Sequence, residues 1–171
     1  MRLTPTSYIV LGLLARAGGQ ATPYGLKQAA ATSVGNLWSV QHAQLYTEPE
    51  RLAGAGLVQE ERESGGRRRR MYTITDEGRR ALAEWLATPA DSQSELRDPG
   101  LLQLFFGAEP AAIAPPQRAV HQRKLEEYLD LHRTYGEKMA RGERLALEAG
   151  IAHEREWLRF WGQLQGDSNQ S

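Results

Sequence analysis

Residues 57–86 read LVQEERESGGRRRRMYTITDEGRRALAEWL, and they carry the strongest signals of the fold. Leu57 and Val58 open a strand, the Ser-Gly-Gly sequence at 64–66 reverses the chain, and the alternating residues from Met71 to Thr75 form a second strand. Thr75 is then placed to cap a helix whose first turn holds two acids. We therefore expect a β-hairpin followed by a helix, with four consecutive arginines at the hairpin tip.

Three helices are expected before this hairpin. Thr4 and the proline after it are typical of a helix start, and residues 5 to about 16 are apolar almost all round, as in a central buried helix. Thr22-Pro23 starts a second helix, and Ser39 is the expected cap of a third helix over about 40–55. Three helices, a hairpin and a fourth helix form a winged helix-turn-helix, in which the hairpin is the wing. To its core we assign Trp38 and the stripe of the fourth helix, which consists of Ala81, Leu82, Trp85 and Leu86.

The second half of the chain has a different pattern. After a polar stretch comes a short apolar helix, followed by two long amphipathic helices, one opened by Pro115-Pro116 and one over about 142–164. Two such helices cannot easily bury their apolar faces alone, so a second copy of the chain is the expected partner. The predicted fold is mainly α with a small β-hairpin: a winged helix-turn-helix domain at 1–88, a linker at 89–98, a C-terminal helical dimerisation domain at 99–166 and a disordered tail at 167–171.

Composition narrows the class of protein. The 171 residues include no cysteine, which excludes disulfides and thiolate metal sites and fits a reducing compartment. The apolar run at 8–15 is too short to span a bilayer, so we expect a cytoplasmic protein with no membrane association. The formal net charge is +0, yet basic residues exceed acidic ones over 1–90 and the reverse holds over 91–171. The N-terminal half is therefore the one suited to a polyanion.

The arginine run has two interpretations. Charge runs are usually solvated surface, and three glutamates on the opposite strand could pair with the arginines. However, the hairpin carries five arginines, so this pairing cannot neutralise it. Arginine forms bidentate hydrogen bonds with phosphate groups. We therefore expect the wing to contact a nucleic-acid backbone through Arg67, Arg68, Arg69 and Arg70.

The third predicted helix supplies side chains that can contact bases. Its sequence, SVQHAQLYTEPERLAGAG at 39–56, places hydrogen-bonding side chains near the helix start, where a recognition helix meets the major groove. Alone, such positions are more often plain surface, but followed by a basic wing they indicate DNA recognition. The candidate contacts are Ser39, Gln41, His42, Gln44, Tyr46 and Thr47.

The sequence shows no pattern that indicates metal binding or catalysis. His121 and His132 are 11 residues apart on one predicted helix, too far to bind one ion together, and His153 stands alone. The sequence has no Ser/His/Asp arrangement and no phosphate-binding glycine loop. We expect no catalytic residue, no metal and no cofactor, so the protein is not predicted to be an enzyme.

An aromatic group near the C-terminus has two interpretations. Trp157 and Trp161 are four residues apart on the last predicted helix, near Phe160, and Tyr128 lies on the apolar stripe of the preceding helix. Aromatic residues at this spacing are usually buried for their area, in a core or a dimer interface. A flat aromatic effector would also stack on an indole ring, so these four residues are candidates for a ligand site or a dimer interface.

Several motifs together resemble a known family. The stretches YIVLGLL, YGLKQ, LWSVQHAQLYTEPERLAGAGLV, YTITDEGRRALAEWL and RDPGLLQLFF follow one another as in the PadR family of bacterial transcriptional regulators, and the C-terminal region is similar to the virulence-activator-like tail of one PadR subgroup. The resemblance implies a homodimeric winged-helix repressor on a pseudo-palindromic operator, released in many members by a small aromatic or hydrophobic ligand. It places Tyr24 and Lys27 at the entry of the helix-turn-helix as DNA contacts, and makes the LLxLFF helix at 101–106 a packing element.

One departure from the family pattern matters most. Where the family usually has IYPELKRLE, this chain has LYTEPERLA, so Pro49 stands where a leucine is expected. Pro49 cannot donate a hydrogen bond to the carbonyl of Leu45, and its ring crowds that carbonyl. Either the recognition helix bends at this point or the core repacks around the proline.

Two other functions stay open at this stage. A winged helix can serve as a protein-interaction module without operator binding, which the glutamates of the first hairpin strand and a bent third helix favour. A small-molecule carrier built on Trp157 and Trp161 is a third alternative. Retardation of DNA from the gene's own upstream region separates the regulator from both.

Overall fold

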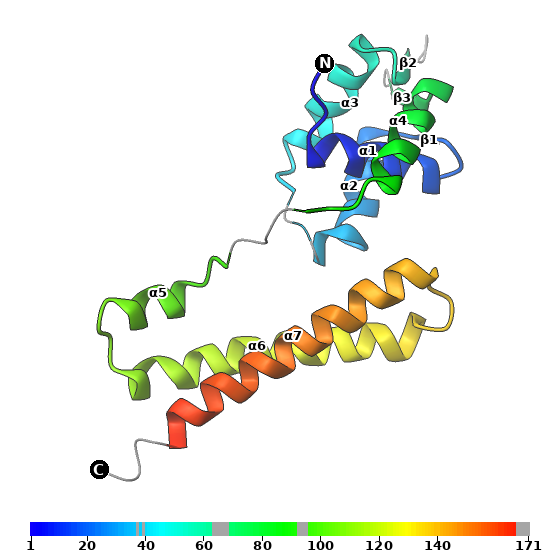
Figure 1. Cartoon of the computed structure of the whole chain (residues 1–171). Helices are drawn as coiled ribbons and strands as arrows, with labels where there is room; N and C mark the ends of the chain where they lie inside the picture. The colour runs from blue at the N-terminus through cyan, green and yellow to red at the C-terminus, as the bar shows by residue number, and fades with distance from the viewer. Residues whose placement is uncertain (37, 39, 63–68, 92–95, 167–171) are drawn as a thin grey trace. The chain divides into compact units, whose positions relative to one another are not determined.

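The computed structural model describes residues 1–36, 38, 40–62, 69–91 and 96–166, and the chain divides into two compact units, 1–92 and 93–171. The first unit contains α1 (Pro5–Arg16), β1 (Gln20–Ala21), α2 (Pro23–Ala31), the short 3₁₀ helix η1 (Val34–Asn36), α3 (Gln44–Gly54), β2 (Val58–Arg62), β3 (Arg70–Ile74) and α4 (Asp76–Ala87). The second unit contains α5 (Pro99–Phe105), α6 (Pro110–Tyr135) and α7 (Arg141–Gly166) (Figure 1). The predicted fold class, mainly helical with a small β-sheet, is confirmed.

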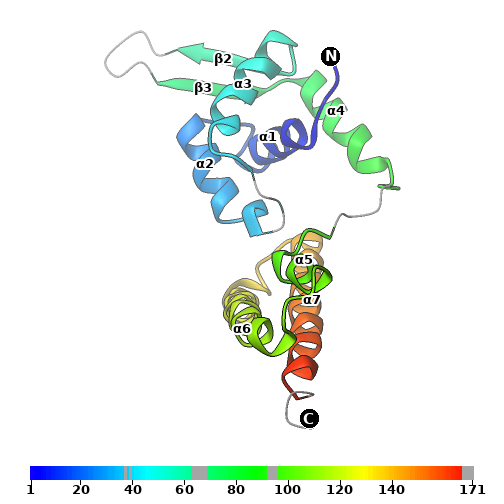
Figure 2. The ribbon, with the colours of Figure 1, turned by 90° about the vertical axis from the view of Figure 1, so that its left-hand side faces the viewer.

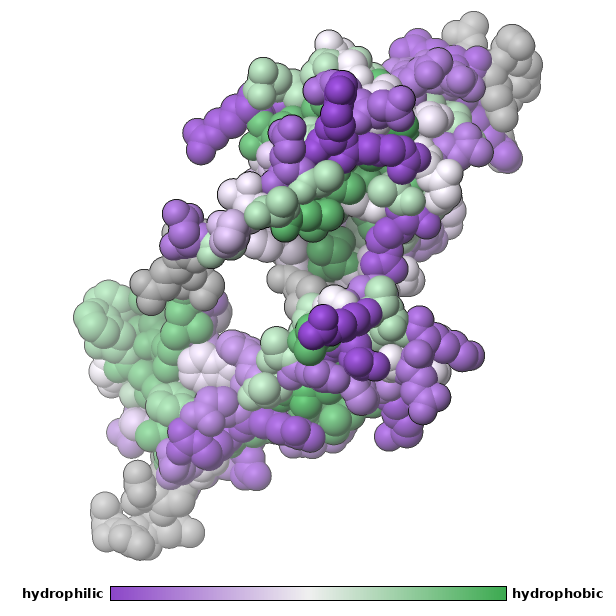
Figure 3. Space-filling view, turned by 45° about the vertical axis from the view of Figure 1, so that its right-hand side comes forward, coloured by the Kyte–Doolittle hydropathy of each residue, from purple (hydrophilic) through white to green (hydrophobic). Residues whose placement is uncertain are grey.

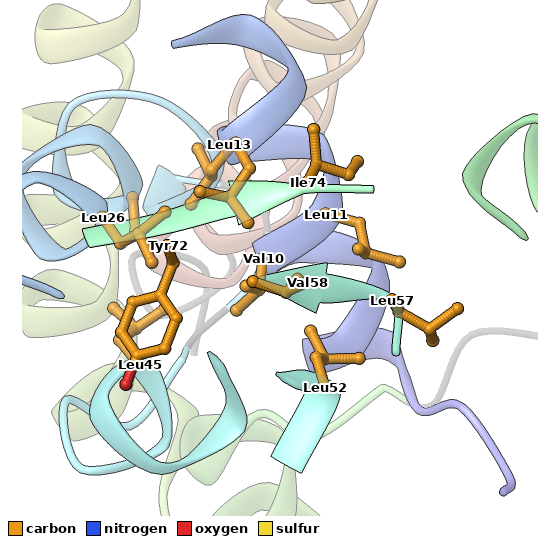
Figure 4. Close-up of a cluster of buried hydrophobic side chains, with 12 residues drawn as sticks. Val10, Leu11, Leu13, Leu26, Leu45, Leu52, Leu57, Val58, Tyr72 and Ile74 are labelled. Carbon is orange, nitrogen blue, oxygen red and sulfur yellow. The ribbon is translucent and has the colours of Figure 1, made fainter. Parts of the chain in front are cut away.

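Helix α1 lies at the centre of the first unit, as its uniformly apolar sequence predicts. Its start is fixed by the expected cap: the Thr4 side chain accepts from the backbone N–H of Ser7, and Ser7 Oγ accepts from the Thr4 N–H at 2.8 Å. Side chains from α2, α3 and the sheet pack around it (Figure 4), and the buried cluster consists of Val10, Leu11, Leu13, Leu14, Leu26, Ala30, Leu45, Leu52, Leu57, Val58, Tyr72 and Ile74. Because α3 and the hairpin both contribute to this cluster, the core fixes one relative to the other.

The predicted hairpin belongs to a three-stranded antiparallel sheet in the order β1-β3-β2. Strands β2 and β3 pair from Val58 opposite Ile74 to Arg62 opposite Arg70 (Figure 2). Strand β1 was not predicted, because two residues are too short to show an alternating pattern. Gly19, at a φ of 99° that glycine adopts without strain, leads into β1, and its carbonyl accepts from the Ile74 N–H at 2.8 Å. Strand β3 is therefore held on both sides.

Helix α3 begins later than predicted. The sequence predicts a start near residue 40, whereas the helix begins at Gln44 and its N-cap residue, Ala43, has no side-chain hydrogen bond to offer. The carbonyls of Gln41 and His42 instead accept from the backbone N–H groups of Gln44 and Leu45, at 2.9 and 3.1 Å. Gln41 and His42 thus lie in a tight turn that leads into the helix, and the predicted cap Ser39 lies outside the described residues.

Pro49 is accommodated inside α3, which continues as one helix from Gln44 to Gly54. The proline is fully buried, on the face that also carries Leu45 and Leu52. An apolar ring therefore occupies the core position where the family pattern has a leucine. This burial agrees with repacking of the core around the proline, one of the two alternatives that the sequence leaves open.

The predicted burial of three large side chains is wrong within the first unit. Trp38, Trp85 and Leu86 are 51%, 45% and 69% exposed. Helix α4 meets the core through its first turns, where Gly78 is buried, and its later residues extend past the core; the Trp85 ring stacks on Tyr8 with 4.6 Å between ring centroids. Trp38 lies in the irregular segment before α3, where helical periodicity does not determine which side chains are buried.

In the second unit, α6 and α7 form a helical hairpin with a buried apolar cluster of Leu125, Tyr128, Leu147 and Ile151. Helix α6 begins at Pro110, so the predicted start at Pro115-Pro116 is wrong. Those prolines cannot donate to the carbonyls of Ala111 and Ala112, but both alanines are exposed, and water can satisfy their carbonyls.

Helix α5 is the LLxLFF element, and in this unit it leaves much of its apolar surface uncovered. Leu102, Phe105 and Phe106 are exposed, Phe105 to 82%. Figure 3 shows a hydrophobic patch in the second unit, at the end that carries α5. Among the helices described, none combines the length and the apolar character needed to cross a membrane.

Candidate nucleic-acid interface

Helix α3 has one buried and one exposed face. Leu45 and Leu52 anchor the buried face in the core. The exposed side chains begin in the turn before the helix and continue along its first turn, so the structure brings five of the predicted contacts together at one end of α3. They are Gln41, His42, Gln44, Tyr46 and Thr47. A helix that presents hydrogen-bonding side chains at its N-terminal end has the form of a recognition helix.

Helix α2 adds a second exposed set. Its start is capped by Thr22, whose Oγ1 accepts from the Gly25 N–H at 3.1 Å. Tyr24 is exposed at this end of the helix, and its hydroxyl accepts a hydrogen bond from Gln28 Nε2 at 2.7 Å. Lys27 is half-buried on the same helix. The tyrosine hydroxyl is thus held at the surface by a neighbour one helical turn away.

The arginines of the wing differ in their surroundings. Arg69 is exposed, whereas Arg70 forms an ion pair with Glu50 of α3, and its Nε lies 3.7 Å from Glu60 Oε1. Glu60 also accepts a hydrogen bond from Arg62 Nε at 2.6 Å. Arg67 and Arg68 lie outside the described residues. Pairing with the glutamates of the first strand, one of the two interpretations of the sequence, therefore occurs at Arg62, and in part at Arg70.

A partly buried charge pair, not identified from the sequence, ties the recognition helix to α1. Arg51 Nε donates to Glu48 Oε2 at 2.9 Å, and Arg51 Nη2 donates to Ser7 Oγ at 2.8 Å. Glu48 and Ser7 are buried, and Ser7 belongs to the first turn of α1. The spacing of Glu48 and Arg51 is typical of a surface ion pair on a helix. Only the position of α1 against α3 reveals that Glu48 is buried.

The same pair makes stability depend on pH. Burial raises the pKa of Glu48, but hydrogen bonds from Arg51 and Ser7 and the charge of Arg51 lower it by more, so it lies below its ordinary value of 4.5. A carboxyl group with a lowered folded-state pKa stabilises the fold above its unfolded pKa, and this contribution is lost as the pH falls through the folded-state pKa.

Glu48→Gln is therefore expected to lower the free energy of unfolding by about 1 to 2 kcal/mol at neutral pH. The deficit should shrink as the pH falls below the ordinary value of 4.5 and approaches the lower folded-state pKa, where the carboxylate of the folded parent protein becomes protonated. Urea denaturation at several pH values measures it. Glu77→Gln is the matched control, because Glu77 and Arg80 form an ion pair at the same spacing with both side chains exposed. Equal deficits for the two variants, at every pH, would contradict the prediction.

In the second unit the four aromatic candidates fall into two groups. Trp161 and Tyr128 are buried, and among the described residues Trp161 Nε1 has no hydrogen-bond partner. Trp157 and Phe160 are half-buried and pack edge to face, with 5.7 Å between ring centroids, and Trp157 Nε1 donates to His153 Nε2 at 2.7 Å. Packing thus accounts for the first group, while the second keeps a partly accessible aromatic surface.

A histidine–carboxylate pair beside this aromatic group was also missed from the sequence. His121 Nδ1 of α6 lies 2.6 Å from Glu154 Oε2 of α7, and both side chains are nearly buried. The imidazole also stacks on Trp157, with 5.7 Å between ring centroids. The two residues are 33 positions apart, so only the pairing of α6 with α7 brings them together.

Two concave surfaces of the second unit lie elsewhere. One depression at the α6–α7 turn is lined by charged residues that include His132, Arg144 and Glu148, and one beside α5 is lined by Leu102 and Phe106 with their neighbours. Trp157 and Trp161 line neither. Within the described part of the chain, no three His, Asp or Glu side chains gather as a metal site would require.

Comparison with known families separates the same two regions. Residues 10–84 match the transcriptional regulator PadR-like family, and residues 96–163 match the C-terminal domain of virulence activator alpha. The two matches together span most of the chain.

Individual proteins extend the similarity to the whole chain. The negative transcriptional regulator PadR of Bacillus subtilis (strain 168) is 27% identical over 149 residues, which is 83% of this chain and 79% of that protein. The crystal structure of Bacillus subtilis PadR in complex with operator DNA has a TM-score of 0.84 at 21% identity and covers 97% of this chain and 98% of its own. That of the same protein in complex with p-coumaric acid has a TM-score of 0.79 at 20% identity, covering 99% and 100%.

Proposed function

We propose that the chain, which matches the PadR-like family of transcriptional regulators over residues 10–84 and the C-terminal domain of virulence activator alpha over residues 96–163, represses transcription from an operator in double-stranded DNA as a homodimer, and that a small aromatic ligand releases it. The observation that carries the proposal is the exposed polar set at the start of α3, held in one unit with the arginine-bearing strand of the wing. The proposed protein is not an enzyme, and it acts in the cytoplasm, where the DNA lies.

Each region has its own part in the proposal. Residues 1–88 bind DNA: α3 enters the major groove, and the wing with Arg69 meets the flanking backbone. Residues 99–166 form the dimer, joined by a linker at 89–98, so that two half-sites lie about one helical turn apart, ~34 Å. The uncovered apolar side chains of α5 support this pairing, because exposed apolar patches of this kind mark interaction surfaces.

Release by a small aromatic ligand is supported by a relative and by two aromatic rings of this chain. A PadR protein from Bacillus subtilis has been crystallised with p-coumaric acid, a small aromatic acid. In this chain Trp157 and Phe160 keep partly accessible rings on which a flat molecule could stack. Titration of the protein–operator complex with aromatic acids tests release directly, since bound DNA should decrease as the acid concentration rises.

The test of the function is binding to DNA from the gene's own upstream region, measured by gel retardation and by fluorescence anisotropy over a series of salt concentrations. We expect a retarded complex at moderate salt, with an affinity that falls steeply as salt increases. A shuffled sequence of the same length is the control. If no salt concentration gives retardation, the chain is better described as a protein-interaction module.

Gln44 is expected to influence which operator sequence is preferred. Its side chain is exposed at the first position of α3, and glutamine pairs bidentately with adenine in the major groove. Gln44→Ala should cost about 1 to 3 kcal/mol of discrimination at one base pair and leave the salt dependence of binding unchanged. Affinities for a set of single-base operator variants measure this. An equal loss on every variant would instead mark Gln44 as a backbone contact.

A further inference from the structure

Two neighbouring arginines of the wing have different surroundings. Side chains alternate between the faces of a strand, so Arg70 and Tyr72 of β3 share one face. Tyr72 is fully buried in the same core cluster as Leu45 of α3 (Figure 4). Arg70 therefore lies on the face of β3 that meets the recognition helix, whereas Arg69 precedes the strand and is exposed.

The partner of Arg70 is an acid on the exposed face of the recognition helix. Glu50 follows Tyr46 by four residues and Thr47 by three, so the three side chains are neighbours on the helix surface. Arg70 Nη1 forms an ion pair with Glu50 Oε1. Without a counter-charge, a carboxylate at this place would repel the phosphates of any DNA that meets Tyr46 and Thr47.

We propose that Arg70 is a positioning residue that serves as the internal counter-charge of Glu50, and that it does not contact phosphate. The pair joins the wing strand to the recognition helix and removes the negative charge from the face that meets DNA. Glu60 Oε1 also lies 3.7 Å from Arg70 Nε. The inference rests on the proposed function, because it assigns a role within operator binding.

The alternative is that Arg70 leaves Glu50 on binding and binds one more phosphate. The two roles predict opposite behaviour when both charges are removed together. If Arg70 binds phosphate, its removal weakens DNA binding whichever residue stands at position 50. A counter-charge is needed only while Glu50 is acidic.

The experiment is a double-mutant cycle on operator affinity and its salt dependence, with Arg70→Gln, Glu50→Gln and the combined variant. Arg70→Gln alone is expected to weaken binding about tenfold, because it exposes the charge of Glu50 to the DNA. The combined variant should return to within about threefold of the parent affinity, with the parent salt dependence. Both side chains are partly exposed, so each variant should fold, and a thermal melt checks this.

Arg69→Gln, alone and with Glu50→Gln, is the matched control. It should lower the slope of log affinity against log salt by about 0.9 for each phosphate that the protein no longer neutralises, in both backgrounds. If the combined Glu50→Gln and Arg70→Gln variant stays as weak as Arg70→Gln and its slope falls in the same way, Arg70 contacts phosphate and the inference is overturned. If the parent protein itself does not bind the operator, the proposed function is wrong. If the parent protein binds but the effects of Arg70→Gln and Glu50→Gln simply add, only the role proposed for Arg70 is wrong.

Discussion

Replacing Trp161 with alanine is expected to lower the free energy of unfolding of the C-terminal unit by about 3 to 5 kcal/mol. Trp161 is fully buried, and its ring packs on Phe160 and Trp157 with centroid distances of 5.0 and 6.3 Å. Removing the indole leaves a cavity in a unit of three helices, where few other side chains can fill it. Because this unit is also the proposed dimer-forming region, the variant should lose operator binding together with stability.

Trp161→Phe separates the loss of packing from the loss of the indole N–H. The buried Nε1 has no hydrogen-bond partner among the described residues, and an unsatisfied buried donor costs about 1 to 3 kcal/mol. Phenylalanine removes that donor and keeps an aromatic ring, so its loss of stability should be well below that of alanine. Thermal and urea denaturation followed by circular dichroism measure both.

Phe105→Ala is the control for a large aromatic side chain at the surface of the unit. Because Phe105 is 82% exposed, its removal should leave the stability of the single chain nearly unchanged. If it lies in the proposed dimer interface, the same variant weakens self-association, which sedimentation detects. Equal destabilisation by Trp161→Ala and Phe105→Ala at a concentration where the chain is monomeric would contradict the packing described above.

Alanine at Arg67, Arg68 and Arg69 together is expected to weaken operator binding on the order of a hundredfold, because each arginine can neutralise a phosphate and a homodimer presents two wings. The slope of log affinity against log salt should fall by about one for each phosphate left without its arginine. Arg70 is left in place, since its partner is Glu50. Binding to shuffled DNA should weaken by a similar factor, because phosphate contacts do not distinguish sequences.

Arg62→Ala is the matched control within the same hairpin. Arg62 is exposed, and its Nε donates to Glu60 at 2.6 Å, so its charge is already paired inside the wing. Its removal should change operator affinity and salt dependence little. A triple variant with the parent's affinity and salt slope would show that the wing does not contact the DNA backbone.

Most elements of the fold could be predicted from the sequence because their signals are local. Thr4, Thr22 and Thr75 cap α1, α2 and α4 as expected, and the alternation around Tyr72 gives β3. The predictions that were wrong concern positions where local pattern and tertiary packing compete. Pro115 and Pro116 lie within α6, and Trp85 extends past the core that α4 meets with its first turns.

The candidate site divides in the same way. Sequence alone was enough to propose which side chains at the start of α3 and which arginines of the wing face DNA, because helical spacing and a charge run are properties of neighbouring residues. It could not distinguish Arg70 from Arg69, since the ion pair with Glu50 spans two elements that only the shared core brings together.

From the sequence we could predict the order of the α-helices and of the two strands of the hairpin, and the polar character of the recognition helix. Hydrophobic periodicity and capping residues act over a few positions, and a single chain displays them fully. Only the tertiary structure shows that Glu48 is buried against α1, that His121 contacts Glu154 and that Arg70 forms an ion pair with Glu50. Charge pairs of this kind depend on how elements distant in the chain pack, because a side chain's environment is set by its neighbours in space.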